Sequence, residues 1–368
     1  MESTDVCVLH IAGDAGAESL QGIVQALAQL GLHQVLLPLR PAFAARSLEQ
    51  VELRMLQWPR PLLARLHALE EELAALAAAR SFYAVHLHGA IACLLGSRAL
   101  RESTVAARLP HSTRLLFSPR LSHLSAWKSV LVGRMLKAEL APLHRGVLLA
   151  SPGEAHILSR LLERSAEVLP PKVDALYLQA SRAESARPAI LAGGAGIEAI
   201  DGVSRLAVLL NGREERVAIA WLGPVSRWEG AQLQATGVQV FDAEDDAATA
   251  RLLSSATAYL HISPTAVRLR ALAQAMAAGV PCLASDTLAH RALVRHGETG
   301  FICAGDLDFV ERLILLLRDA GERERVGQAA RAEATRLFTL RHFEAAVLRA
   351  YGFHRVTLLP KKSSIHVA

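Results

Sequence analysis

Residues 261–301 constrain the fold of this chain more than any other stretch. They begin with a short apolar run that ends at Ser263, and a helix-prone run follows. The Gly-Val-Pro sequence at 279–281 ends that helix, because glycine suits a helix C-terminus and proline cannot continue a helix. A second apolar run, 282–284, leads to Ser285 and Asp286. The order strand, crossing helix, strand predicts a parallel sheet that is covered by helices.

The same alternation recurs along the whole chain. Apolar runs predict strands, and apolar spacing of three and four predicts helices. The predicted strands are residues 5–11, 34–39, 83–88, 114–118, 147–151 and 167–169, then 190–191, 217–222, 238–241, 259–262 and 282–284; the predicted helices include 19–30, 62–79, 125–140 and 203–210. A polar stretch, 176–188, is interpreted as a linker. The pattern predicts an α/β protein of two Rossmann-like, doubly wound domains that face a cleft, with ligands at the carboxyl ends of the strands.

Length and composition agree with two packed domains. The chain has 368 residues, of which 52% are hydrophobic, so a largely disordered protein is excluded. Its four cysteines are far apart and lie in apolar runs, which predicts buried thiols in a reducing compartment. No run is long and apolar enough for a membrane span, and the N-terminus lacks the pattern of a signal peptide. A cytoplasmic protein is expected.

Basic side chains concentrate between residues 101 and 145. They predict an anionic partner surface, either the inner face of a membrane or a phosphate-bearing acceptor, through Arg114, Arg120, Lys128, Arg134 and Lys137. No basic groove interleaved with aromatic residues is present, so nucleic acid is not an expected partner. Within 124–143 the apolar residues Trp127, Val130, Leu131, Leu136 and Leu140 have near-helical spacing. This helix either covers a core or contacts a membrane.

Motifs at fixed separations add a family likeness. Ala275-Met276-Ala277, Gly279, Pro281, Ala284-Ser285-Asp286 and Gly297-Glu298-Thr299-Gly300 follow one another in an order and spacing that resembles the donor-binding segment of glycosyltransferase family 4. Weaker likenesses to the same family occur at residues 15–18, 85–89, 118–120, 149–154, 168–174 and 338–351. The resemblance therefore covers nearly the whole chain.

This resemblance implies a GT-B fold. Residues 1–180 would form the acceptor-side domain, 181–340 the nucleotide-sugar domain, and 341–368 a C-terminal helix that returns to the first domain, with a tail. It also implies a retaining hexosyltransferase with a nucleotide-sugar co-substrate and no other cofactor. The acceptor would be a glycan or a lipid-linked molecule, in surface polysaccharide or glycolipid assembly.

The chain departs from the family at the positions that carry charge. Two glutamates of the family fall on Ala266 and Gln274, and the Arg and Lys that neutralise the donor diphosphate fall on Gly194 and Asp201. The family's G-G-x-x-E becomes residues 288–292, and the histidine of its S-P-H-G becomes Arg120. A carboxylate beside a diphosphate repels it, which leaves open two alternatives to an active enzyme. One is a non-catalytic subunit that pairs with an active transferase, and the other is a sugar-nucleotide-binding regulator.

The candidate site residues follow from these motifs. Arg120, His123 and Gln274 are the catalytic candidates, and Gly16, Arg268, Gln274, Ser285 and Asp286 are the donor-binding candidates. Arg268 and Arg270 lie near a helix N-terminus, which favours anions, but only one of them can face the cleft. Ala266, Gln274 and Asp201 are expected to surround one cavity.

No metal site is expected from the sequence. His86 and His88 alternate along a predicted strand, so they share one face of it. A third ligand is not evident near them in the sequence, and a zinc site needs at least three.

Overall fold

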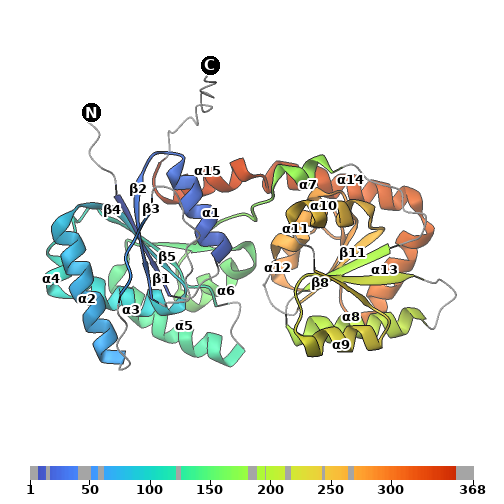
Figure 1. The fold of residues 1–368 in the computed structure, drawn as a ribbon, viewed down its shortest axis with the longest axis horizontal. Helices are drawn as coiled ribbons and strands as arrows, with labels where there is room; N and C mark the ends of the chain where they lie inside the picture. The colour runs from blue at the N-terminus through green and yellow to red at the C-terminus, as the bar shows by residue number, and fades with distance from the viewer. Residues whose placement is uncertain are drawn as a thin grey trace, which may run out of the picture.

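The computed structural model describes residues 7–13, 17–39, 51–56, 62–121, 126–180, 189–194, 196–211, 217–242, 245–263 and 269–353. Two lobes lie side by side, and each contains one parallel β-sheet with helices on both faces (Figure 1). Among the described residues, no helix is long and apolar enough to cross a membrane.

The first lobe holds a seven-stranded sheet in the order β3-β2-β1-β4-β5-β6-β7. Every neighbouring pair is parallel. The strands are β1 Cys7–Ala12, β2 His33–Pro38, β3 Val51–Leu53, β4 Phe82–His88, β5 Arg114–Ser118, β6 Val147–Ala150 and β7 Ala166–Val168. The helices between them are α1 Ala17–Ala28, α2 Leu62–Ala79, α3 Ala90–Leu100, α4 Ser103–Ala106, α5 Ala126–Leu140, the short 3-10 helix Ala141–Leu143 and α6 Pro152–Leu162.

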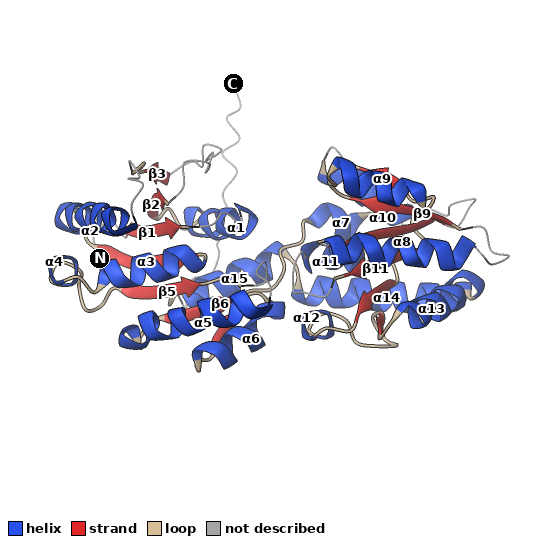
Figure 2. Ribbon diagram, turned by 90° about the horizontal axis from the view of Figure 1, so that it is seen from below, coloured by secondary structure: helices blue, strands red, loops and turns tan. Residues whose placement is uncertain are grey.

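Alternate residues of these strands enter two different cores. Leu9 and Val85 pack under α2, α3 and α5, whereas their neighbours Val8 and Ala84 pack on the opposite face under α1. Side chains alternate across a strand, so a strand buried on both faces must be apolar at nearly every position. This explains why the strand signals in the sequence are continuous runs, and Figure 2 shows helices on both sides of the strands.

The second lobe holds a six-stranded parallel sheet in the order β10-β9-β8-β11-β12-β13. Its strands are β8 Ala189–Gly194, β9 Ala218–Leu222, β10 Gln239–Phe241, β11 Ala258–Ile262, β12 Cys282–Ser285 and β13 Phe301–Cys303. Helices α8 Ile197–Asn211, α9 Arg227–Ala235 and α13 Asp306–Arg318 cover one face; α7 Ala175–Gln179, α10 Asp246–Ser255, α11 Leu269–Ala277, α12 Leu288–Arg291 and α14 Ala320–Leu337 lie on the other side.

The chain passes between the lobes twice, and the two passages touch each other. The last helix, α15 Leu340–Ala350, packs on α1 of the first lobe, with Phe343 and Val347 buried in the core there. Val173, on the earlier passage, forms a parallel bridge with Thr339, and its N–H donates to the carbonyl of Phe338 at 2.8 Å. Residues 181–188 lie outside the described part of the chain, so the domain boundaries stay predictions.

All four cysteines are buried free thiols. The two lobes also meet where α6 contacts α12 (Figure 1). This contact joins the helix after β6 to the helix after β12, both of which follow the carboxyl end of a strand.

Candidate functional site

The carboxyl edge of the second sheet carries Ser285 and Asp286. Ser285 ends β12, and its hydroxyl accepts a hydrogen bond from the N–H of Ser263, at the end of β11, at 3.2 Å. Asp286 is bound by Arg291 of α12 at 2.6 and 2.8 Å, and this hydrogen bonding lowers the pKa of the carboxyl group. Ser285 therefore joins two strand ends, and the charge of Asp286 is already neutralised.

Gln274 lies on α11, the helix that follows β11 in the chain, and its side chain is buried. On the same helix, Arg270 reaches away to Asp246 of α10 at 3.1 Å, and Asp246 also accepts the hydroxyl of Tyr177 at 2.8 Å. Arg270 is thus engaged between helices. Ala266 and Arg268 lie outside the described residues.

Gly194 leaves no space for the arginine that the family carries. It ends β8, and a Cβ there would lie 2.0 Å from the carbonyl oxygen of Ile262 and 2.7 Å from the Cβ of Ala199. Carbon atoms essentially never approach an oxygen that closely. The loss of the arginine is therefore built into the packing of β8 against β11.

Asp201 and Gln274 lie on helices that cover opposite faces of the second sheet. The carboxylate of Asp201 accepts a hydrogen bond from Gln232 of α9 at 2.6 Å. Its helix, α8, belongs to the core on one face of the second sheet, and α11 belongs to the core on the other face. The predicted clustering of these side chains around one cavity stays a prediction, and the third member, Ala266, is not described.

A buried histidine pair stands under the same edge. His261 Nδ1 lies 2.9 Å from His290 Nε2, and His290 Nδ1 lies 2.6 Å from the carbonyl oxygen of Ser285. That carbonyl can only accept, so His290 carries its hydrogen on Nδ1 and offers its Nε2 lone pair to His261. Burial lowers the pKa of His290 and keeps it neutral. His290 directly follows Leu288 and Ala289, the two positions on which the family's glycine pair falls.

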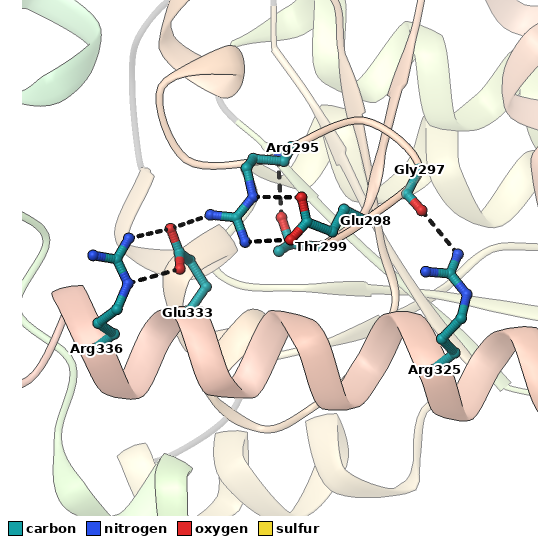
Figure 3. Close-up of polar contacts among 7 residues, drawn as sticks. All are labelled: Arg295, Gly297, Glu298, Thr299, Arg325, Glu333 and Arg336. Atoms are coloured by element: carbon teal, nitrogen blue, oxygen red, sulfur yellow. Dashed lines mark hydrogen bonds and ion pairs between the residues drawn. The ribbon is translucent and has the colours of Figure 1, made fainter.

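The Gly297–Gly300 turn has a structural role. Arg295 binds Glu298 at 2.7 Å within the turn and Glu333 of α14 at 2.6 Å, and Arg336 binds Glu333 as well, at 2.9 Å (Figure 3). Arg325 donates to the carbonyl of Gly297 at 2.8 Å. These contacts fasten the turn to α14.

Three buried histidines lie toward the carboxyl end of β1 and β4 in the first lobe. His10 pairs with His86 in register, and His88 lies two residues further along the same face. His10 Nδ1 is 3.0 Å from His88 Nε2, and the rings of His86 and His88 are 3.7 Å apart between centroids. The structure confirms that His86 and His88 share a face. It adds His10, which the sequence analysis missed.

Hydrogen bonds fix the tautomers of His10 and His88. Gln34 Nε2 donates to the carbonyl of Val24 at 3.0 Å, so Gln34 Oε1, 3.0 Å from His10 Nε2, must accept. His10 then carries its hydrogen on Nε2 and turns the lone pair of Nδ1 toward His88. Desolvation by burial lowers the pKa of His10 to about 4 and the pKa values of His86 and His88 well below 6.5. All three rings are neutral at pH 7.

Arg120 lies two residues beyond the end of β5, beside this triad. It is half-buried, its positive charge contributes to the lowered pKa of His88, and its φ of 54° is in the left-handed region. A non-glycine residue there is strained, and such strain often occurs at functional sites. Of the remaining candidates, Gly16 and His123 lie outside the described residues. The roles of all the candidate residues stay predictions.

Two parallel, doubly covered sheets, with a final helix that returns to the first, define the GT-B fold of glycosyltransferases. Residues 230–333 match the family described as Glycosyl transferases group 1. That match includes Gln274, Ser285 and Asp286. No curated protein matches the sequence.

Solved structures of the same fold align over nearly the whole chain. Sucrose-phosphate synthase from Thermosynechococcus elongatus aligns with a TM-score of 0.71 at 15% identity, over 95% of this chain and 98% of that one. HepE from Anabaena, solved with UDP and glucose, gives 0.70 at 13% identity, over 94% and 99%. The lipopolysaccharide outer core galactosyltransferase WaaB gives 0.69 at 15%, over 95% and 99%. At these identities the likeness establishes the fold.

Proposed function

We propose that this chain is a glycosyltransferase that takes its sugar from a nucleotide sugar. The nucleotide is held at the carboxyl edge of the second sheet, and the acceptor is held at the edge of the first sheet. The observation that carries the proposal is the match of residues 230–333 within a full-length GT-B fold. Gln274, buried on the helix after β11, supplies hydrogen bonds to a ribose hydroxyl.

Turnover is expected to be slow. The described part of the chain has Gly194 and Asp201 where the family has its two cations, and the loss of one charge-stabilising group costs about 10²–10³ in rate. If a cation does hold the diphosphate, Arg268 is the first candidate, because Arg270 already binds Asp246.

Calorimetry with UDP and UDP-glucose, followed by a product assay on the purified chain, tests the proposal. Binding with sugar transfer or hydrolysis is expected. Gln274→Ala should weaken binding, and Gln328→Ala, which alters an exposed glutamine on α14 instead, should not. Absence of binding across a panel of nucleotide sugars would exclude the transferase function.

The second candidate function is that of a non-catalytic subunit or sugar-nucleotide-binding regulator that partners an active transferase. The packing of Gly194 against Ile262 favours it, because the arginine cannot be accommodated without a backbone shift. Binding of UDP-glucose without any turnover, in a chain that stimulates a partner transferase, would select this function.

We also propose that α5 contacts an anionic lipid surface, which suits a lipid-linked acceptor. Leu136 and Leu140 are buried, but Val130, Leu131 and Met135 are 46%, 53% and 50% exposed beside the exposed Lys128 and Arg134. The apolar residues thus divide between the core and the surface. Two other predicted contacts are engaged within the protein: Lys137 with Glu163, and Arg114 with the carbonyl of Ala350.

Co-sedimentation with vesicles that contain phosphatidylserine tests this surface. Binding should weaken with salt, since the Debye length falls from about 10 Å at 0.1 M to about 3 Å at 1 M. Leu131→Glu should weaken it further, while Leu307→Glu, at an exposed leucine of α13, serves as the control. Binding that is indifferent to salt and to Leu131→Glu would exclude α5 as the contact.

A further inference from the structure

We propose that His10, His86 and His88 form a zinc site in the first lobe. The strands β1 and β4 place the three rings on one face, and one ring nitrogen from each lies within 4.8 Å of the others. Imidazole nitrogen is a preferred ligand of Zn²⁺, and three protein ligands suffice for a site. The proposal is independent of the proposed function.

The first support is the spacing of the nitrogens. Ligand nitrogens at about 2.0–2.1 Å from a tetrahedral zinc ion are about 3.3 Å apart. His10 Nδ1 and His88 Nε2 are already 3.0 Å apart, so this pair needs to open by only a few tenths of an ångström, and the hydrogen on His88 Nε2 moves to its Nδ1 when the ion binds. His86 must move more, by side-chain rotation alongside His88.

The second support is the orientation of His10. Metal-bound histidine usually donates its other ring N–H to an oxygen, which fixes the ring and raises its basicity. Gln34 Oε1 accepts that hydrogen from His10 Nε2, and Gln34 is itself held by the carbonyl of Val24. The Nδ1 lone pair of His10 therefore points into the cluster, in the form that a metal requires.

The third support is the surroundings of His86. Its Nδ1 lies 2.7 Å from the hydroxyl of Tyr351, and its Nε2 lies 2.8 Å from the hydroxyl of Ser118. Coordination replaces one of these contacts, and the other continues to hold the ring. Burial keeps Tyr351 protonated by raising its pKa, so its hydroxyl can donate to or accept from the ring.

Water would take the fourth position, because the triad supplies three ligands and a tetrahedral zinc ion has four. His10 and His86 are fully buried and His88 is 6% exposed, so only the His88 side gives access to an ion. Zinc there would join β1 to β4 and, through Tyr351, would hold the end of α15 against the first sheet. The alternative arrangement is a chain of hydrogen bonds from His88 through His10 to Gln34, with no metal.

Zinc titration of the chelator-treated, full-length chain tests the proposal. We expect one Zn²⁺ per chain and a higher unfolding temperature with zinc than with chelator. His10→Gln and His88→Gln should each abolish this uptake. His290→Gln is the matched control, because it breaks a similar buried histidine pair at 2.9 Å in the second lobe, and it should leave uptake unchanged.

Gln34 separates a metal site from a merely buried cluster. Gln34→Leu removes the acceptor and should weaken zinc binding by about 10–100-fold, whereas Gln34→Glu keeps an acceptor oxygen and should retain it. The visible spectrum of the wild-type chain with Co²⁺, which is intense only for a tetrahedral ion, does not depend on whether any variant folds. A weak octahedral spectrum, or zinc uptake that survives both histidine substitutions, would overturn the proposal in favour of the hydrogen-bonded chain.

Discussion

At the scale of single residues, the clearest structural reason for the departure from the family is the close packing around Gly194. Gly194→Ala places a methyl group against the carbonyl of Ile262 and should destabilise the protein by about 1–3 kcal/mol in urea unfolding. Gly230→Ala is the opposite-sign control, because its nearest neighbour lies at 3.5 Å and alanine favours the helix by about 0.5–1 kcal/mol. Equal changes in stability for the two variants would show that the backbone of β8 can shift to accommodate a side chain at position 194.

The buried histidines make stability depend on pH. The pKa of His10 is lowered from 6.5 to about 4, and those of His86 and His88 are lowered too. Above pH 6.5 the contribution of these neutral rings is complete. As the pH falls from 6.5 to 4, unfolded histidine binds protons that the folded form rejects, so stability decreases by up to about 1.4 kcal/mol per pH unit for each residue.

Urea unfolding between pH 7 and 5, with chelator present, measures this slope. His10→Gln should reduce this slope by the contribution of one of the three histidines. A midpoint that stays constant over this interval would contradict the assignment of neutral, buried rings.

Sequence reasoning at the residue scale found two of the three triad histidines. His86 and His88 belong to one strand, so period-two alternation placed them on one face. His10 lies 78 residues before His88, and only the pairing of β1 with β4 brings them together. Strand order is a property of tertiary packing, which local spacing does not encode.

At the scale of elements, the turn after α12 depends on a shared carboxylate. Glu333 accepts from both Arg295 and Arg336, and its side chain is only 10% exposed. Glu333→Ala leaves Arg295 without this partner and should destabilise the protein by about 1.5–3 kcal/mol in denaturant unfolding. Glu324→Ala, an exposed position on the same helix, should change stability by less than about 0.5 kcal/mol. A similar effect at both positions would argue against a structural role for this network.

Long elements with a strong pattern were predicted well, and short ones were predicted less reliably. The helix at 62–79 and the strand at 114–118 have the predicted bounds. Among the three-residue strands, β7 and β10 were predicted, whereas β3 and β13 were missed, because three residues are too few to show a period reliably. Helix α3 was missed because it is buried between the sheet and its neighbouring helices, so its apolar residues show no clear face.

At the scale of the whole molecule, α15 should stabilise the first lobe, although it follows the second lobe in the sequence. Phe343 and Val347 are buried against the first sheet, and Phe343 contacts Gly22 of α1. Phe343→Ala should cost about 3–5 kcal/mol, and amide hydrogen exchange should accelerate in β1 and β4 more than in β11 and β12. Leu340→Ala, at a residue of the same helix that is 38% exposed, is the control. Faster exchange confined to the second lobe would contradict this assignment of α15.

The return of α15 also sets an order of events on the ribosome. The first sheet is fully synthesised at Val168, but α1 alone covers the face that bears Val8, Ala84 and Leu116 until residues 343–351 emerge. At about 5–20 residues per second, the nascent chain spends roughly 10 to 35 seconds with the rest of that apolar face uncovered. The second lobe is fully synthesised before α15 packs on the first sheet. A chaperone therefore has the largest exposed apolar surface to bind before α15 emerges.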